Sequence, residues 1–292
     1  MEKNKIEIKL SAVIPIYNEE AVVAGVIEDL KGKLSELNIE HEIIAVNDGS
    51  SDQSGFILEK IDGIKLINHP VNRGYGASLK TGIKNSRYDW ILIIDADGTY
   101  PTAAISELMG EAGQYDLVVG SRQKKGNVIP PNRRFAKKFL NWFAGYLVGR
   151  KIPDLNSGLR IFRKKIVFEY WDLFPSRFSF SSTLTMICLT HGYETVFLPI
   201  DYYRRQGNSS IRSKDFFGFI RLVVKLSLFF KPLKVFIPIS LFLLAIALLL
   251  GILFYAGVIG VLLDTTIMIL GATALQTFFF GLLAEIVIHN KN

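Results

Sequence analysis

The chain has 292 residues, with 34 lysines and arginines against 27 aspartates and glutamates, and a single cysteine. This length fits one large domain or two small ones, and the lone cysteine excludes an internal disulfide and suits a reducing compartment. Hydrophobic residues make up 49% of the chain and the mean hydropathy is +0.28, more than a soluble globular domain needs. The charged start MEKNKIEIKL leads directly into a strand pattern, which predicts no signal peptide.

Residues 1–120 alternate short apolar runs with helical patterns. The runs are IKLSAVIPIY, HEIIAVND, IKLINHP, DWILIIDAD and YDLVVGSR, and residues 19–37 and 74–85 show helical periodicity between them. Continuous apolar strands alternating with helices indicate an α/β domain with a mostly parallel sheet covered by helices on both faces. Such sheets bind ligands outside the carboxyl ends of their strands, so YNEE, NDGSSD and DADGTYP are predicted to converge on one site.

Residues 130–231 continue this domain and then approach a membrane. Residues 130–150 read as a basic, aromatic-bearing helix, SGLRIF and ETVFLPIDYY as strands, and SFSSTLTMICLTHG as a helix. Residues 216–231, FFGFIRLVVKLSLFFK, set three basic residues among apolar ones. This pattern predicts an amphipathic helix in the membrane interface, with a helix packed in the core as the alternative.

Residues 235–288 carry only two formal charges, Asp264 and Glu285. One helix of that length would measure roughly 80 Å against roughly 30 Å of hydrocarbon, which predicts two spans. We place them at about 235–255 and 266–288. Basic residues flank the outer ends and not the connecting turn, so both termini and the preceding domain are expected in the cytoplasm, anchored to the cell membrane. The expected organisation is a cytosolic domain at 1–212, an interfacial helix at 213–233 and a membrane domain at 234–292.

One segment carries most of the positive charge. Between Arg122 and Lys165 lie thirteen lysines and arginines and one acid, Asp154, so the rest of the chain is slightly acidic. A solvated basic face and a nucleic-acid surface are the alternatives. No recognised nucleic-acid-binding motif accompanies the segment, and it precedes the membrane spans. We therefore expect phosphates and anionic lipid headgroups as partners, and no nucleic acid.

Two aspartates, Asp95 and Asp97, follow the buried apolar run of DWILIIDADGTYP. A carboxylate pair at a strand end can hold Mg²⁺ or Mn²⁺ and bridge the ion to substrate phosphates. A general acid and base, or a helix cap near Pro101, are the alternatives. The position of the pair at the end of a buried strand favours the metal.

Two further loops carry polar side chains at strand ends. Asp48 and Asp52 of VNDGSSD can accept hydrogen bonds from a base, a ribose or a backbone N–H. NRGYGASLKTG is similar to a dinucleotide fingerprint, but Leu79 stands at the third glycine position, which argues against a nicotinamide site. Arg73 and these glycines could still contact a phosphate at the helix N-terminus.

The motifs VIPIYNEE, VNDGSSD, NRGYGASLKTG, DADGTYP, GSR and DLNSGLRIFRK resemble, in this order and spacing, glycosyltransferase family 2. More narrowly, they resemble its dolichyl-phosphate mannose synthase and polyprenyl-phosphate glycosyltransferase branch. The resemblance covers residues 8–210 and implies a GT-A nucleotide-sugar domain, often followed by two spans.

The resemblance also implies roles for individual residues. Nucleotide contacts fall on Pro15, Tyr17, Glu19 and Asp48, and the metal on the diphosphate is held by Asp95 and Asp97. Arg122 and Asp154 fall on the acceptor side. Where the family has an arginine before G-x-S-K, this chain has RRQGNSS, so Arg204 or Arg205 fills that role and a serine replaces the lysine. Arg133 and Arg134 join Arg122 as candidate ligands of the lipid phosphate.

These observations predict a membrane-anchored, metal-dependent, inverting glycosyltransferase. It would move one sugar from a nucleotide sugar to polyprenyl phosphate on the cytoplasmic face, with Asp97, Asp154 and Arg122 as catalytic residues. The acceptor is already anionic, so Asp154 is expected to position substrate or orient an arginine. A hydroxyl acceptor on another lipid or glycan, or a non-catalytic sugar-nucleotide-binding scaffold, are the alternatives. The motifs leave open UDP or GDP, the sugar, dolichyl or undecaprenyl, Mg²⁺ or Mn²⁺, and the oligomeric state.

Overall fold

The computed structural model describes residues 8–123, 131–177, 179–203, 224–225, 227–229, 231–258 and 264–289. The chain forms two compact units, Met1–Gly145 with Arg150–Phe219 and Tyr146–Gly149 with Ile220–Asn292. The first unit contains the sheet and the second contains the long apolar helices.

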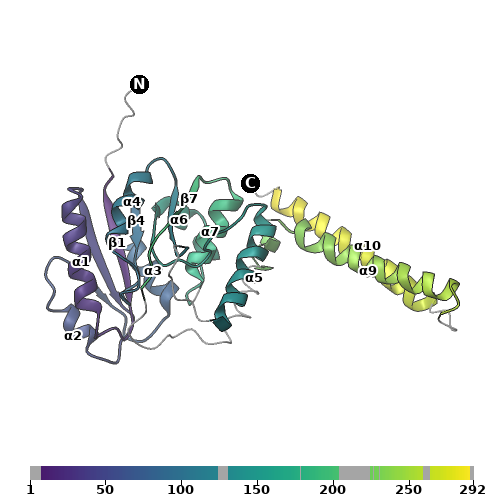
Figure 1. The fold of residues 1–292 in the computed structure, drawn as a ribbon, viewed down its shortest axis with the longest axis horizontal. Coiled ribbons are helices and arrows are strands. Elements are labelled where there is room, and N and C mark those ends of the chain that lie inside the picture. The colour runs from purple at the N-terminus through teal and green to yellow at the C-terminus, as the bar shows by residue number, and fades with distance from the viewer. Residues whose placement is uncertain are drawn as a thin grey trace, which may run out of the picture. The chain divides into compact units, whose positions relative to one another are not determined.

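A seven-stranded, mostly parallel sheet forms the centre of the first unit (Figure 1). Its strands are β1 (Leu10–Ile16), β2 (His41–Asn47), β3 (Lys65–Asn68), β4 (Trp90–Ile93), β5 (Leu117–Ser121), β6 (Arg160–Arg163) and β7 (Thr195–Pro199). They lie in the order β3-β2-β1-β4-β6-β5-β7, and β6 runs antiparallel to both of its neighbours. The strand order reverses at β1, where this class of sheet binds ligands. The predicted fold class is confirmed.

Helices cover both faces of this sheet (Figure 1). The helices that alternate with the strands along the chain are α1 (Val23–Glu36), α2 (Ser54–Leu58), α3 (Tyr75–Lys84), α4 (Ala104–Glu111), α5 (Pro131–Val148), α6 (Lys164–Glu169) and α7 (Phe180–Thr190). Successive side chains of a strand point to opposite faces. In β1, Ala12 and Ile14 join the core beneath α1 and α4, whereas Val13 packs against Gly82 of α3. The strands are therefore buried on both sides, as their unbroken apolar runs predict.

The loops after β1 and β2 are tied together at the carboxyl edge of the sheet. The two strands are parallel, with Ile16 beside Asn47. Asn18 donates its N–H to Ser50 Oγ at 3.1 Å, and its Oδ1 accepts the N–H of Ser51 at 2.8 Å. The predicted convergence of strand ends is thus built by direct bonds between loops.

Helices α9 (Leu233–Tyr255) and α10 (Asp264–His289) pack along each other in the second unit. Ser240 Oγ donates to the carbonyl of Ala274 at 2.8 Å. The most apolar 18-residue stretches of the two helices have mean hydropathies of 2.9 and 1.9, and both helices are long and apolar enough to cross a membrane. The two predicted C-terminal helices are present. The interfacial helix expected at 213–233 lies mostly outside the described residues and stays a prediction.

Helix α3 begins directly against the segment at residues 175–177. Gly76 donates its N–H to the carbonyl of Arg177 at 2.9 Å, and Ala77 donates to that of Ser176 at 2.6 Å. A Cβ on Gly76 would overlap the carbonyl of Pro175, so glycine is required by this close approach. These two N–H groups thus have partners inside the protein, and the phosphate contact considered for Arg73 and the glycines of this loop stays a prediction.

Gly76→Ala should therefore destabilise the first unit, although alanine is the better helix former. We expect a loss of about 1–3 kcal/mol from overpacking, seen as a lower melting temperature of the full chain in detergent. Gly25→Ala in α1 is the matched control, because a Cβ there meets nothing within 4 Å and should be neutral or slightly stabilising. A Gly76→Ala protein that melts no lower than the Gly25→Ala protein would contradict the tight packing.

Candidate active site

Asp95 and Asp97 lie just beyond the end of β4, on a turn at the carboxyl edge of the sheet. Asp97 is buried, and its Oδ1 accepts the N–H of Thr99 at 3.1 Å and the Thr99 hydroxyl at 2.6 Å. Asp97 thus closes this turn, as the capping interpretation allowed. Turn closure and metal binding are compatible, because a carboxylate offers about four lone-pair sites.

Asp95 is held by residues from two other segments. Tyr75, the first residue of α3, donates its hydroxyl to Asp95 Oδ1 at 2.8 Å. On the other side lies Gly158, where any Cβ would overlap the Asp95 carboxyl group. Gly158 itself donates its N–H to the Tyr100 hydroxyl at 2.6 Å. Three loops remote in sequence thus fix the position of one carboxylate.

The electrostatics of this pair suit a divalent cation. Burial and the neighbouring charge of Asp97 raise the pKa of Asp95 to about 6, while the Tyr75 hydroxyl and Arg122 act in the opposite direction. Neighbouring carboxylate charges repel each other, and a cation bound beside them relieves this repulsion. The described residues include no cluster of three or more metal-binding side chains. Mg²⁺ is often held by one or two carboxylates and substrate phosphates, so this donor set fits such an ion.

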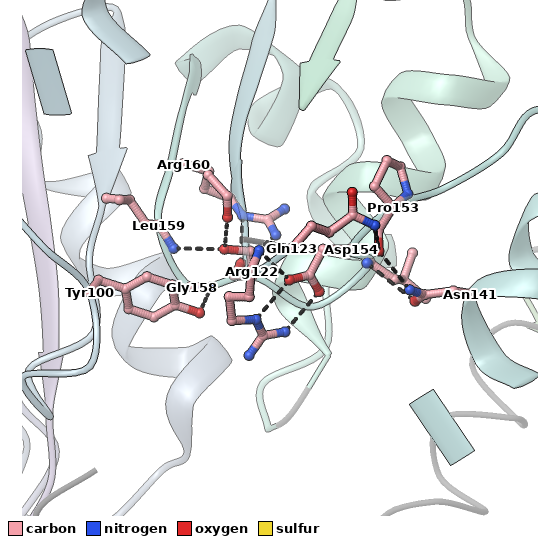
Figure 2. A network of polar contacts seen from close by, with 12 residues as sticks. Tyr100, Arg122, Gln123, Asn141, Pro153, Asp154, Gly158, Leu159 and Arg160 are labelled. Atoms are coloured by element: carbon pink, nitrogen blue, oxygen red, sulfur yellow. Dashed lines mark hydrogen bonds and ion pairs between the residues drawn. The ribbon is translucent and has the colours of Figure 1, made fainter. Parts of the chain in front are cut away.

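Arg122 and Asp154 form a bidentate ion pair (Figure 2), and Arg122 is close enough to act on the charge of Asp95. Arg122 follows β5, and Asp154 lies in the loop between α5 and β6. Arg122 Nε donates to Asp154 Oδ2 at 2.7 Å, Nη2 donates to Oδ1 at 2.8 Å, and the backbone N–H donates to Oδ2 at 3.1 Å. The Asp154 side chain is 0% exposed and that of Arg122 is 16% exposed. The carboxylate therefore orients the arginine, one of the two roles expected for it.

The Nη1 group of Arg122 is the part of the guanidinium that can bind a ligand. Within the part of the chain that the structure describes, Nη1 makes no hydrogen bond. Burial opposes the charged form, but Tyr100 and Asp154 beside it raise the pKa of Arg122 well above its usual range. The guanidinium is therefore a permanent, oriented cation that can receive an anion.

Two tyrosines complete the wall behind this arginine. The guanidinium carbon of Arg122 lies 5.2 Å from the centre of the Tyr202 ring, and Tyr100 meets that ring edge-on at 5.2 Å. Neither tyrosine is among the residues predicted from the sequence. Tyr100 directly follows DADGT and could have been suspected, whereas Tyr202 reaches the site only through the pairing of β7 with β5.

A second buried arginine, Arg160 in β6, supports the loop that carries Asp154. Arg160 is fully buried and donates to the carbonyls of Ser157 at 3.0 Å and Ser181 at 2.7 Å and to the Thr185 hydroxyl at 3.1 Å. Burial lowers its pKa. These bonds tie the DLNSG loop to α7. An arginine inside the apolar run SGLRIF is the signal that could have revealed it.

Asp48 holds the loop that leads into α3. Its carboxylate accepts the N–H groups of Arg73 at 3.0 Å and Gly74 at 2.8 Å, and His69 Nδ1 lies 2.7 Å from it. Of the partners considered for Asp48, the structure shows the backbone N–H groups. They place Tyr75 for its bond to Asp95, so Asp48 acts on the site at least through this loop.

The other expected site residues fall into two groups. Pro15 is the last residue but one of β1 in the buried sheet, Tyr17 is 42% exposed in the loop beyond the strand, and Glu19 is partly exposed in the same loop. Arg133 and Arg134 lie in the first turn of α5, where the structure describes the backbone but not the side chains. Arg204 and Arg205 lie outside the described residues. The structure thus brings Asp95, Asp97, Arg122 and Asp154 together, and the other assignments stay predictions.

Comparison with known proteins places this site in a family. The model of "Glycosyl transferase family 2" matches residues 11–171. The low-salt glycan biosynthesis hexosyltransferase Agl6 of Haloferax volcanii is 29% identical over 210 residues, 70% of this chain and 50% of that protein. An undecaprenyl-phosphate 4-deoxy-4-formamido-L-arabinose transferase of Proteus mirabilis is 33% identical over 165 residues, which are 54% of this chain and 50% of that protein. The chain thus spans about half the length of these two relatives.

Solved structures agree with the fold. Glucosyl-3-phosphoglycerate synthase of Mycobacterium tuberculosis, in complex with Mn²⁺, UDP and phosphoglyceric acid, superposes with a TM-score of 0.58. The alignment covers 75% of this chain and 78% of that one, at 17% sequence identity. At this identity the likeness establishes the fold alone.

The raised pKa of Asp95 predicts how pH and metal change stability. The folded state binds a proton on the Asp95 carboxyl group more tightly than the unfolded chain does. The stability that this proton contributes is therefore lost as the pH rises through about 6. Asp95→Asn mimics the protonated group. When a chelator removes divalent ions, the variant should have a higher melting temperature than the wild type above that pH. The difference should vanish in acid.

Added Mn²⁺ should raise the melting temperature of the wild type above that of Asp95→Asn, because the ion stabilises only the protein that keeps the carboxylate pair. Asp29→Asn on the exposed face of α1 is the control and should track the wild type. Equal stabilisation of wild type and Asp95→Asn by Mn²⁺ would remove Asp95 from the metal site.

Proposed function

Because the chain belongs to glycosyl transferase family 2, we propose that this glycosyltransferase moves a sugar from a nucleotide donor to polyprenyl phosphate. The observation that carries the proposal is the Arg122–Asp154 pair beside Asp95 and Asp97. A carboxylate pair suited to a diphosphate-bound cation thus adjoins an oriented cation suited to a second phosphate. A polyprenyl-phosphate acceptor supplies that second phosphate.

Asp95 and Asp97 would hold Mg²⁺ or Mn²⁺ on the donor diphosphate. When bound, such an ion neutralises the charge that develops on the departing nucleoside diphosphate. Tyr75 and Gly158 keep Asp95 in place for this, and Thr99 keeps Asp97. The carboxylates are preorganised by the fold, so little reorganisation is needed when the donor binds.

Arg122 would receive the acceptor phosphate through its Nη1 edge. A phosphate monoester is anionic near neutral pH, so its oxygen attacks the sugar without losing a proton to a strong base. Attack from the face opposite the leaving diphosphate inverts the configuration at the sugar carbon. Asp154 is buried and bonded three times to Arg122, which supports an orienting role and counts against proton removal. A hydroxyl acceptor, which needs such a base, is correspondingly disfavoured.

The rest of the donor site would come from the neighbouring loops. Pro15, Tyr17, Glu19 and Asp48 are the proposed nucleotide contacts, with Arg204 or Arg205 closing over the diphosphate. Arg133 and Arg134 are proposed to assist Arg122 with the lipid phosphate. The undecaprenyl-phosphate transferase of Proteus mirabilis supports an acceptor of this class by its name.

The membrane would present the acceptor to this site. Helices α9 and α10 are proposed to span the bilayer, with both termini and the catalytic unit on the cytoplasmic side. In α5, Trp142 is 63% exposed and Lys138 is exposed one turn before it. A tryptophan and a lysine on one exposed helical face suit the headgroup region, where the lipid phosphate lies.

A panel of radiolabelled nucleotide sugars tests the function directly. Membranes containing the protein, supplied with Mg²⁺ or Mn²⁺ and polyprenyl phosphate, should form a labelled lipid with one donor. Asp95→Ala and Asp97→Ala should each abolish this transfer while the melting temperature shows that the protein stays folded. No labelled lipid from any donor with a folded wild type would refute the proposal, and tight donor binding without transfer would favour a non-catalytic scaffold.

Asp154→Asn separates the orienting role from that of a general base. We expect its main effect on the Michaelis constant of the acceptor, which should rise about 10- to 150-fold as a charge-assisted bond to Arg122 is lost. Turnover at saturating acceptor should largely persist. Abolished turnover with an unchanged acceptor Michaelis constant and intact donor binding would instead identify Asp154 as a base for a hydroxyl acceptor.

A further inference from the structure

Helix α5 is bonded to the loop at residues 153–155, which contains Asp154. Asn141 Nδ2 donates to the carbonyl of Pro153 at 2.9 Å, and Asn141 Oδ1 accepts the N–H of Leu155 at 3.4 Å. One side chain therefore binds the residue before Asp154 and the residue after it. Figure 2 shows this contact beside the Arg122–Asp154 pair.

The bonds continue from this loop to the guanidinium. Asp154 accepts both guanidinium bonds that orient Arg122. Gln123 Nε2 also donates to the Pro153 carbonyl, at 3.2 Å, but makes no bond to Leu155. Asn141 is therefore the described side chain that holds the loop on both sides of Asp154.

Asn141 also connects two parts of the proposed acceptor site. It lies on the side of α5 that turns toward the loop, with the buried Ala144 one turn later, whereas Lys138 and Trp142 are exposed. The helix proposed to rest against lipid headgroups is thus bonded to the loop that orients the arginine. A shift of α5 would move Asp154 and, through it, Arg122.

We propose that Asn141 is a positioning residue for the acceptor phosphate, acting through the 153–155 loop and Asp154 on Arg122. The proposal rests on the function above, because it assumes that Arg122 receives the acceptor phosphate. Asn141 touches neither the Asp95–Asp97 pair nor Arg122 in any bond among the described residues. Its effect should therefore fall on the acceptor and spare the donor.

The test replaces Asn141 by leucine, which has a similar size and neither hydrogen-bonding group. The acceptor Michaelis constant should rise about 5- to 10-fold, as expected for a lost positioning bond. Donor binding measured without acceptor should be unchanged. The same rise with a short, water-soluble prenyl phosphate would show that the effect acts through the arginine rather than through membrane docking.

Asn85→Leu is the matched control, because the side chain of Asn85 bonds, among the described residues, only to the nearby carbonyl of Thr81 in α3. Gln123→Leu should give a smaller effect than Asn141→Leu, since it removes one bond to Pro153 and leaves Leu155 held. In an Arg122→Gln background, Asn141→Leu should change the acceptor Michaelis constant less than about two-fold, because residues acting through one another are not additive. Loss of donor and acceptor affinity alike, or a full effect of Asn141→Leu without Arg122, would overturn the proposal.

Amide hydrogen exchange gives a readout that needs no activity. In Asn141→Leu, the amides of Leu155 and Arg122 should exchange faster, while those of β1 and α3 keep wild-type protection. Unchanged exchange at both amides would show that Asn141 does not hold the loop. If the wild type transfers sugar but Asn141→Leu behaves like Asn85→Leu, this inference is wrong and the proposed function stands. If the wild type makes no lipid product, the function is wrong, and the exchange result still decides whether the loop is held.

Discussion

The ion pair between Arg122 and Asp154 is the interaction on which the arrangement of the site depends. A fully buried carboxylate is costly unless it is paired and hydrogen-bonded, and here one arginine supplies three bonds to it. The pairing also fixes which edge of the guanidinium faces outward. The loop that carries Asp154 is in turn held by Asn141 on one side and by Arg160 beyond it. Much of the buried polar structure around the sheet edge therefore serves to aim one cation.

The sheet topology explains why cations and carboxylates meet at that edge. The strand order reverses at β1, and β6 runs antiparallel between β4 and β5. The end of β4, the end of β5 and the start of β6 consequently lie at the same edge, bringing Asp95, Arg122 and Gly158 together. A fully parallel arrangement would send the start of β6 to the opposite edge. The antiparallel strand is therefore what places the loop carrying Asp154 beside Asp95 and Asp97.

The sequence predicted the sheet, the two apolar C-terminal helices and the convergence of the strand ends. Unbroken apolar runs and polar strand ends carry that information locally. The contacts of Asp95 with Tyr75 and Gly158 could not be predicted, because they join segments whose spacing along the chain says nothing of their distance in space. The close packing at the NRGYG motif could not be predicted for the same reason. Its Gly76 admits the carbonyl of Pro175, from a segment remote in sequence, against the start of α3.

The hydrogen bonds of Asp95, Asp97 and Asp154 bear on whether the proposed acceptor is a hydroxyl or a phosphate. A hydroxyl nucleophile needs a carboxylate whose lone pairs face the substrate. Here Asp154 accepts hydrogen bonds from Arg122, and Asp97 closes a turn with Thr99. Asp95 is held by Tyr75, and its pKa is raised by burial and by the neighbouring charge of Asp97, which a bound cation would offset. A phosphate nucleophile needs instead an oriented cation and no base. These contacts therefore support the proposed reaction, in which an acceptor phosphate attacks the sugar carbon and the donor diphosphate leaves.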